Sequence, residues 1–295
     1  MKNFNDIYEV LYREYNDKLE QIRKDVVKEQ IITLIMALVI TIILSKIFHS
    51  WIFIILALVI VVFKSAFSRK SRLYKTIFKG ELIKKLVKEN DENLDFEPER
   101  GIASIIYNKG EFERYDVFKS EDLITGKLEG KYKINMAEVH TEDKRKDSDG
   151  DTHYVTLFHG LFAEIEIDKI VFGKLKLRKN ELKLFGGNKE RVELDSGEFE
   201  RLYDVYATDK IMAMQLLTSD IMQMFIDFKE KYKITPELTL KENKLYIRFG
   251  TGNMFEAILM KKALDYTTLL EYYDTIKFTL DITKEFIKNV KETEI

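Results

Sequence analysis

The chain has 295 residues, of which 45% are hydrophobic and 33% are charged, and its formal net charge is -2. This balanced charge argues against general binding to nucleic acid, which needs an excess of basic residues. The sequence contains no cysteine, which excludes disulfides, thiol nucleophiles and zinc–cysteine sites.

Residues 1–30 are predicted to form a cytosolic amphipathic helix. Apolar side chains recur four and three residues apart, at Tyr8, Tyr12, Tyr15, Leu19, Ile22 and Val26. This spacing places them along one side of a helix, as in a coiled coil. The seam could pack on another helix of the same chain, as a stalk, or on a second copy of the chain. Both a stalk and a homo-oligomer therefore stay open.

Two runs without charge follow, at residues 31–45 and 51–63. We expect a transmembrane helical hairpin over 31–63, with spans of about 31–48 and 51–67, because each run with its flanks just reaches across a bilayer core. A cleaved signal peptide is disfavoured, since many acidic residues precede the first run and no A-x-A-like site follows it. A buried hairpin of a soluble protein is disfavoured by two adjacent runs of this length.

The distribution of basic residues predicts the orientation. Lysine and arginine are frequent before the first run and after the second, whereas the turn between the runs holds only Lys46. The positive-inside rule then places both termini in the cytoplasm. Residues 68–90 are predicted to form a basic cytosolic helix. The residues expected at the membrane interface are Lys46, Trp51, Lys64, Arg69, Lys70 and Arg72.

Residues 91–295 are predicted to form a cytosolic α+β domain. Strand patterns occupy 102–108, 111–118, 131–140, 154–167 and 169–179, and Gly186 and Gly187 suit a hairpin turn. A further strand at 199–207 precedes a helix at 209–231, two strands meet at Asn243, and a helix covers 266–292. This order predicts a mostly antiparallel sheet with two packing helices, for which a pleckstrin-homology-like arrangement is one form.

Several segments of this domain resemble the DUF3137 family of bacterial membrane proteins, whose function is not established. They are FERYDVFKSEDLITGK, KINMAEVH, FHGLF and FERLYDVYATDKIMAMQLL, which follow two adjacent apolar runs. The resemblance covers most of residues 5–290, and its most specific parts are Ser120–Gly126, Glu138–Val139, Phe158–Phe162 and Phe199–Thr208. The chain departs from the expected pattern after Leu217-Thr218, where SDIM stands in place of an early proline. The resemblance implies a membrane-anchored cytosolic domain and supplies no catalytic residues.

Three of the four histidines lie in HTEDKRKDSDGDTHYVTLFHGLF, residues 140–162. His140 and His153 are expected near the two ends of one hairpin loop, where, with Asp151 or Glu138, they could hold a divalent metal. His159 shares a strand face with His153 but lies about 20 Å along the strand, too far for the same ion.

Two other features of this stretch have a structural interpretation. Asp147, Asp149 and Asp151 resemble the start of a calcium loop. An EF-hand would require glycine where Thr152 stands and glutamate where Phe158 stands, so a solvated hairpin loop is favoured. Gly160 is expected at a bulge or at a close backbone approach.

These patterns predict a membrane-anchored cytosolic binding or scaffold module of the bacterial cytoplasmic membrane. It would bind a protein or lipid partner beside the bilayer, without catalysis, cofactor or nucleic acid. The alternative is a membrane-associated, metal-dependent enzyme that uses the His140/His153 loop. A transporter or channel component is disfavoured, because the two apolar runs contain no ionisable residue apart from Lys46 at the edge of the first run.

Overall fold

The computed structural model describes residues 3–48, 69–180, 191–259 and 261–292. The chain divides into two compact units. One comprises Met1–Leu86 with Phe255–Leu270, and the other comprises Val87–Met254 with Glu271–Ile295. We call them the helical unit and the sheet unit, and each is described by itself.

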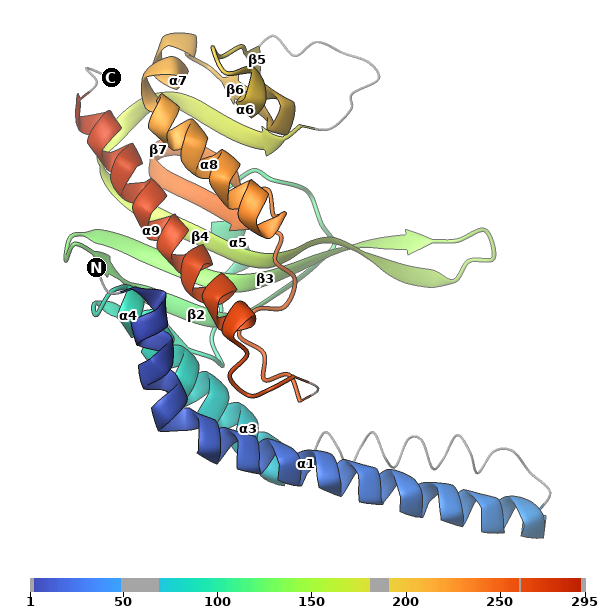
Figure 1. The fold of residues 1–295 in the computed structure, drawn as a ribbon. Coiled ribbons are helices and arrows are strands. Elements are labelled where there is room, and N and C mark those ends of the chain that lie inside the picture. The colour runs from blue at the N-terminus through green and yellow to red at the C-terminus, as the bar shows by residue number, and fades with distance from the viewer. Residues whose placement is uncertain (1–2, 49–68, 181–190, 260, 293–295) are drawn as a thin grey trace. The chain divides into compact units, whose positions relative to one another are not determined.

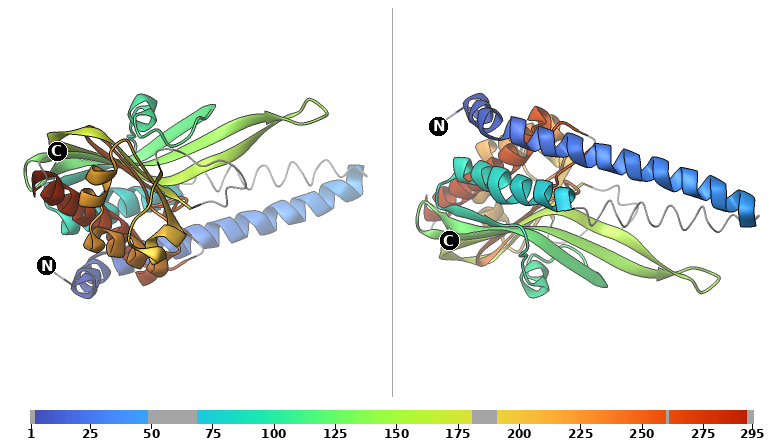
Figure 2. Two further views of the ribbon diagram at one scale, coloured as in Figure 1. Left: turned by 90° about the horizontal axis from the view of Figure 1, so that it is seen from above. Right: turned by 90° about the horizontal axis from the view of Figure 1, so that it is seen from below.

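The helical unit is built around one long helix, α1 (Phe4–Phe48). Three shorter helical segments follow the undescribed residues 49–68: α3 (Arg69–Ile77), the π-helical turn η1 (Phe78–Ile83) and the beginning of α4 (Lys84–Asn90). They run antiparallel to the N-terminal part of α1 (Figure 2, right), with Lys18 3.3 Å from Glu81 and Lys70 3.4 Å from Asp25. The two predicted flanking helices therefore pack on each other within one chain.

The buried seam of α1 differs in part from the predicted one. Its buried apolar residues are Phe4, Ile7, Leu11, Tyr15, Leu19 and Val26. Tyr12 is 45% exposed, and the Tyr8 hydroxyl donates to the Leu264 carbonyl at 2.9 Å. The prediction was wrong for Tyr12, and Tyr8 is half-buried, because the buried face continues from Tyr15 through Leu11 and Ile7.

The apolar part of α1 continues the packed part without a break. Its large side chains between Ile31 and Ile43 are mostly exposed. Among the described residues, α1 is the one helix that is long and apolar enough to cross a membrane. The expected two-helix hairpin is not seen, because the second span at 51–67, with Trp51 and Lys64, lies outside the described residues.

The described residues of the sheet unit form an antiparallel sheet of seven strands, which confirms the predicted α+β class. The strands are β1 (Leu94–Glu97), β2 (Val117–Leu128), β3 (Tyr132–Lys146), β4 (Thr152–Lys179), β5 (Arg191–Val192), β6 (Tyr203–Ala207) and β7 (Glu237–Phe249). The order is β1-β2-β3-β4-β6-β5, and β7 also pairs with β4. The order leaves two edges, so the sheet is open, and the pleckstrin-homology-like arrangement is not found.

The long strand β4 organises this sheet. Its first part pairs with β3 and its last part with β6, while β7 pairs with it from Leu161 to Leu177. The sequence pattern predicted two strands here, at 154–167 and 169–179. They form one strand whose pairing with β7 shifts register between Glu166 and Lys174.

Helices cover the sheet. On one face lie α8 (Ser219–Tyr232) and the main part of α9 (Tyr266–Glu292), whose predicted bounds are confirmed (Figure 1). The Phe228 ring lies 4.6 Å from Phe278 and 5.6 Å from Phe249 of β7. On the other face, Tyr107 of α5 (Ser104–Asn108) packs into a core that includes Val139 and Phe162.

Other predicted elements changed type. Residues 104–108 are helical instead of extended: Tyr107 is buried and Ile105 is 66% exposed, as suits a single helical turn. Residues 199–202 belong to α6 (Gly197–Leu202). The predicted helix 209–231 is two helices, α7 (Lys210–Leu216) and α8, because Leu217 leaves the helical region at φ -90° and ψ 68°. The expected turn at Gly186 and Gly187 lies outside the described residues.

Candidate functional site

A group of ionisable side chains in the sheet unit lies where β3 and β4 pair. Strand alternation puts Glu138 and His140 on the same face of β3. His159 of β4 is the direct partner of His140, so it faces the same side. On β2, Lys119 and Glu121 are the partners of His140 and Glu138. Three neighbouring strands thus gather acidic, basic and imidazole groups on one face.

The two imidazole rings stack. Their centroids are 4.4 Å apart and the ring planes differ by 16°. The His140 Nε2 atom lies 3.1 Å from the Thr156 hydroxyl and 3.8 Å from a Glu142 carboxylate oxygen. Burial, and next the charge of His159, lower the pKa of His140. The pair therefore favours a neutral imidazole at His140 near neutral pH.

Glu138 is the buried anchor of this group, with a side chain only 4% exposed. One carboxylate oxygen lies 2.9 Å from the His159 Nε2 atom, and the other accepts a hydrogen bond from the Met254 N–H at 2.7 Å. Burial raises the pKa of Glu138 against the lowering effect of these two donors. Both carboxylate oxygens are thus engaged within the protein.

His159 and Gly160 also attach the segment that follows β7. The His159 carbonyl accepts from the Gly252 N–H at 3.0 Å. A Cβ atom at position 160 would lie 1.9 Å from the Phe249 carbonyl oxygen and 2.6 Å from the Thr251 nitrogen. Gly160 therefore stands at a close backbone approach, one of the two roles expected from the FHGLF segment. The hydrogen bond from the Met254 N–H to the Glu138 carboxylate holds the same segment two residues further on.

An open hollow of about 450 Å³ adjoins the stacked histidines. Its lining residues are Lys119, Ser120, Glu121, Glu138, His140, His159 and Asn253. The Ser120 hydroxyl donates to the Glu138 carbonyl at 2.8 Å and accepts from the Ile102 N–H at 3.1 Å. A serine held in this way serves the backbone and is not poised as a nucleophile, which needs a base at its hydroxyl.

The predicted pairing of His140 with His153 is wrong. His153 is opposite Arg145, five positions beyond His140 along β3, which corresponds to about 17 Å. Asp151 lies still closer to the hairpin turn. The physical reason is that β3 and β4 continue as strands almost to the turn, so no long loop brings their distant residues together.

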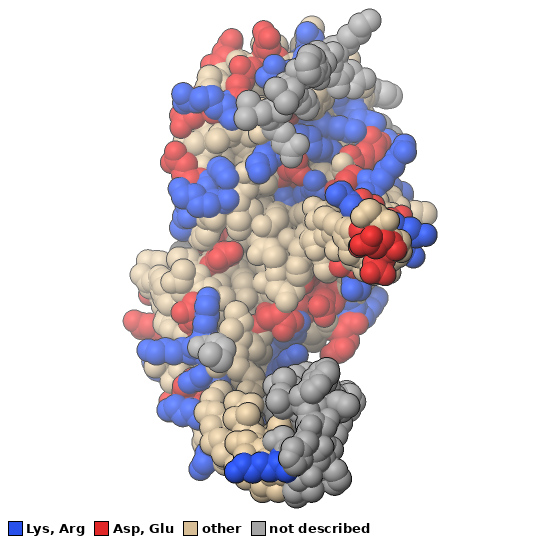
Figure 3. All heavy atoms as spheres, turned by 90° about the vertical axis from the view of Figure 1, so that its right-hand side faces the viewer, with Lys and Arg blue, Asp and Glu red and all other residues tan. Residues whose placement is uncertain are grey.

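The aspartate series forms the turn itself, as the solvated-loop interpretation expected. The Asp147 side chain accepts hydrogen bonds from the N–H groups of Asp149 and Asp151 at 3.0 and 2.9 Å. Gly150 adopts a positive φ of 87°, which glycine allows without strain. Figure 3 looks onto this turn, where acidic side chains are flanked by basic ones.

The interpretation of the sequence missed the partnership of His140 and His159, together with Lys119, Ser120 and Asn253. The SDG turn gives only an approximate register and not this pairing, since regular strands on either side of a turn pair at a constant sum of residue numbers. Asp147 pairs with Asp151 and Lys146 with Thr152. Extrapolation puts His140 opposite Phe158, one residue from its true partner.

A second polar network lies on the other face of the sheet and is structural. The Arg248 guanidinium stacks 4.4 Å from the Phe112 ring and pairs with Glu113 and Glu237. Arg178 stacks on the same ring at 4.5 Å and donates to the Leu238 carbonyl at 2.6 Å. Burial lowers the pKa of Arg178 to about 10. These cations hold the loop after α5 against β4 and β7.

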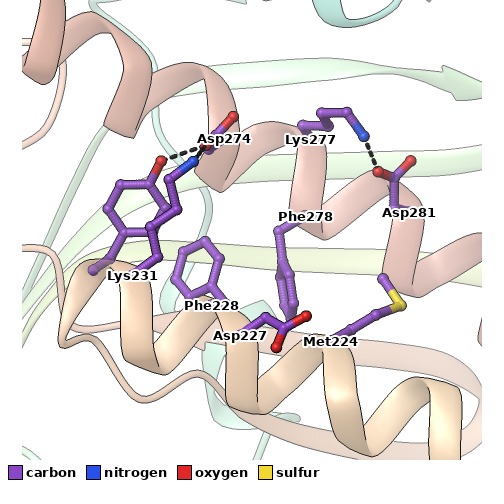
Figure 4. A pocket seen from close by; sticks show the side chains of 9 residues that line it. Met224, Asp227, Phe228, Lys231, Asp274, Lys277, Phe278 and Asp281 are labelled. Carbon is purple, nitrogen blue, oxygen red and sulfur yellow. Dashed lines mark hydrogen bonds and ion pairs between the residues drawn. The ribbon is translucent and has the colours of Figure 1, made fainter.

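A groove of about 310 Å³ runs between α8 and α9 (Figure 4). Its floor is apolar, with Met224, Phe228 and Phe278, and its rims are charged. Lys231 pairs with Asp274 at 2.6 Å, and Lys277 pairs with Asp281. The Lys231–Asp274 pair joins α8 to α9, whereas the Lys277–Asp281 pair lies along α9. The rim charges of the groove thus stabilise the packing of the two helices.

By its fold the protein is an α+β protein with an open antiparallel sheet and one described N-terminal helix that could cross a membrane. Residues 156–288 match the family model described as "Protein of unknown function (DUF3137)". These residues therefore form a DUF3137 domain, and the resemblance seen in the sequence is confirmed over this range. They include His159, Gly160, α8 and most of α9, and leave out Glu138 and His140.

Among solved structures, the chain is similar to the crystal structure of the mycobacterial trehalose monomycolate transport factor A, TtfA. The identity is 11%, the alignment covers 68% of this chain and 92% of that chain, and the TM-score is 0.36. A likeness at this level supports no conclusion about this chain. A comparison with curated proteins gives no match.

Proposed function

We propose that the protein is a membrane-anchored module whose sheet unit binds a protein or lipid partner beside the bilayer without catalysing a reaction. The observation that carries this proposal is the continuity of α1. Its first half is packed inside the helical unit, and its second half exposes a series of large apolar side chains from Ile31 to Ile43. Such a surface is stable in a bilayer and unstable in water.

The packing of α1 makes the anchor part of the folded unit instead of a tether. The Arg23 guanidinium donates to the Leu259 carbonyl at 2.9 Å, and Glu20 accepts from the Ala263 N–H at 3.3 Å. The neighbouring Arg23 bond lowers the pKa of Glu20 most strongly, so this carboxylate stays ionised. We propose that, because α1 is continuous, the helical unit is held at a fixed position relative to the membrane.

The proposal further includes two spans and a cytoplasmic location of both termini, in a bacterial cytoplasmic membrane. The basic residues on both flanks of the apolar runs favour this orientation. A reporter test addresses it: green fluorescent protein fused after Ile295 should fluoresce, and alkaline phosphatase at the same position should be inactive. An active phosphatase fusion would overturn the orientation.

The binding function is tested by capturing the partner in cells. Cells that express the full chain are treated with a membrane-permeable cross-linker, and the membranes are solubilised and purified on a C-terminal tag. We expect a defined cross-linked species whose yield falls when the hollow is filled by Asn253→Trp. As a matched control, Asn180→Trp changes the same residue type away from the hollow. A cross-linked species with the same yield in both variants would show that the hollow does not contact the partner.

The alternative function, a metal-dependent enzyme, requires ligand atoms that converge. His140 and His153 are about 17 Å apart along the hairpin, so they cannot share an ion. Metal content and thermal shift with added Zn²⁺ test what remains. Stoichiometric metal that is lost in His140→Ala and His159→Ala, and kept in His153→Ala, would support a metal-dependent enzyme with its site at the stacked histidines.

A further inference from the structure

We infer that basic residues at the place where α1 leaves α3 form a docking surface for the anionic headgroups of membrane lipids. The surface consists of Lys24 and Lys28 of α1 with Arg69 and Arg72 of α3, and we call it the basic collar. The inference rests on the proposed function, because it takes the apolar part of α1 to lie in the bilayer.

The ion pairs between α1 and α3 fix the level of these residues. Lys70 lies beside Asp25 and Lys18 beside Glu81, in antiparallel register. Arg69 and Arg72 therefore lie level with residues between about 23 and 30 of α1. At a rise of about 1.5 Å per residue, both arginines are within about 12 Å of Ile31 along the axis.

The charge at this level is strongly biased. All four collar residues are exposed. The acidic residues of α1 at the same level are Asp25 and Glu29, and Asp25 already pairs with Lys70. The collar therefore keeps a net positive charge although the whole chain carries -2. Charge complementarity favours an anionic occupant.

The position relative to the apolar surface identifies that occupant as lipid. The exposed apolar side chains begin at Ile31, one helical turn after Lys28. On the same helix, Lys28 and Lys46 are separated by about 27 Å of helical rise, close to the thickness of a bilayer core. A bilayer that receives the apolar stretch thus places one layer of headgroups at the collar, and the exposed Lys46 near the other layer.

The test uses the full chain reconstituted into vesicles of phosphatidylcholine with a minority of phosphatidylglycerol. Electron spin resonance with spin-labelled forms of each lipid measures which headgroup the protein retains at its surface. We expect a preference for phosphatidylglycerol of about fivefold or more, which high salt reduces. The variant Lys24→Gln, Lys28→Gln, Arg69→Gln, Arg72→Gln should lose this preference.

A matched control removes the same number of charges from exposed positions of the sheet unit: Lys127→Gln, Lys133→Gln, Lys144→Gln, Lys146→Gln. It should keep the preference. Equal retention of both lipids by the unmodified chain, or equal loss in the control variant, would overturn the collar. Resistance to alkaline extraction from the vesicles is measured in parallel. Complete extraction would overturn the membrane anchor itself, whereas a firmly inserted chain without headgroup preference overturns the collar alone.

Discussion

Replacement of Gly160 by alanine should destabilise the sheet unit strongly, although it adds a single methyl group. The new Cβ would lie 1.9 Å from the Phe249 carbonyl oxygen and 2.6 Å from the Thr251 nitrogen. Both contacts are backbone atoms, so no side-chain rotation relieves them. The segment after β7 must move away from β4.

The cost follows from what this movement disrupts. Overpacking in a filled site costs about 1–3 kcal/mol. The movement also strains the bond from the Gly252 N–H to the His159 carbonyl and that from the Met254 N–H to Glu138, each worth about 1 kcal/mol. We expect a loss of about 2–4 kcal/mol in the free energy of unfolding.

Thermal unfolding of the full chain in detergent, followed by circular dichroism, measures the effect. For a unit of this size the loss corresponds to a fall in Tm of about 4–16 °C. Gly197→Ala is the matched control, because no heavy atom lies within 4 Å of its added Cβ at the start of α6. Its Tm should be unchanged or slightly raised. A Gly160→Ala chain with the unmodified Tm would refute the close approach.

Four further predictions concern the histidine pair and the structural cations. Because the pKa of His140 is lowered, the folded chain binds fewer protons there than the unfolded chain below about pH 6.5, and stability falls as the pH decreases through that range. His140→Asn should therefore lose less unfolding free energy on acidification than the unmodified chain in urea titrations, with His153→Asn as control. Glu138 has the opposite sign, since its raised pKa lets the folded chain hold a proton more tightly above about pH 4.5. Glu138→Gln should accordingly lose more stability on acidification, and a flatter pH profile would contradict the burial of this carboxyl. The Arg248 side chain is 14% exposed and pairs with the Glu113 and Glu237 carboxylates. Its removal leaves both carboxylates without this cation, so Arg248→Ala should lower the free energy of unfolding by about 3–5 kcal/mol, measured by chemical unfolding. Arg100→Ala, at a side chain 65% exposed, should cost less than about 1 kcal/mol, and equal losses would refute the structural role. Spin labels at 140 and 159 should broaden each other's resonance strongly and labels at 140 and 153 weakly; the reverse would refute the register.

Local patterns predicted the elements whose stability is local. The uncharged run at 31–45 predicted an apolar helix there, which is part of α1, and the periodicity of 266–292 predicted the observed bounds of α9. The predictions failed where neighbours decide the conformation. The β-rich residues 104–108 became a helical turn because Tyr107 fills the core beside Val139 and Phe162. A pattern of apolar residues alone cannot distinguish those outcomes.

The candidate site shows the same division more sharply. Alternation within a strand puts Glu138 and His140 on one face of β3, and the SDG sequence is typical of a tight turn. From that turn, regular pairing would put Phe158 opposite His140 and send His159 to the other face. The register instead shifts between Thr141 and Glu142, which accommodates Leu157 as an extra residue on β4.

The sequence by itself determined the membrane-competent helix, the antiparallel strands and the polar hairpin turn, because each depends on residues close together in the chain. The tertiary structure alone decided that His159 stacks on His140. Its cause is packing: the register shift turns Phe158 onto the core face that it shares with Val139, Phe162 and Tyr107. Burial of that ring, against partners distant in sequence, rotates the next residue onto the face of Glu138 and His140.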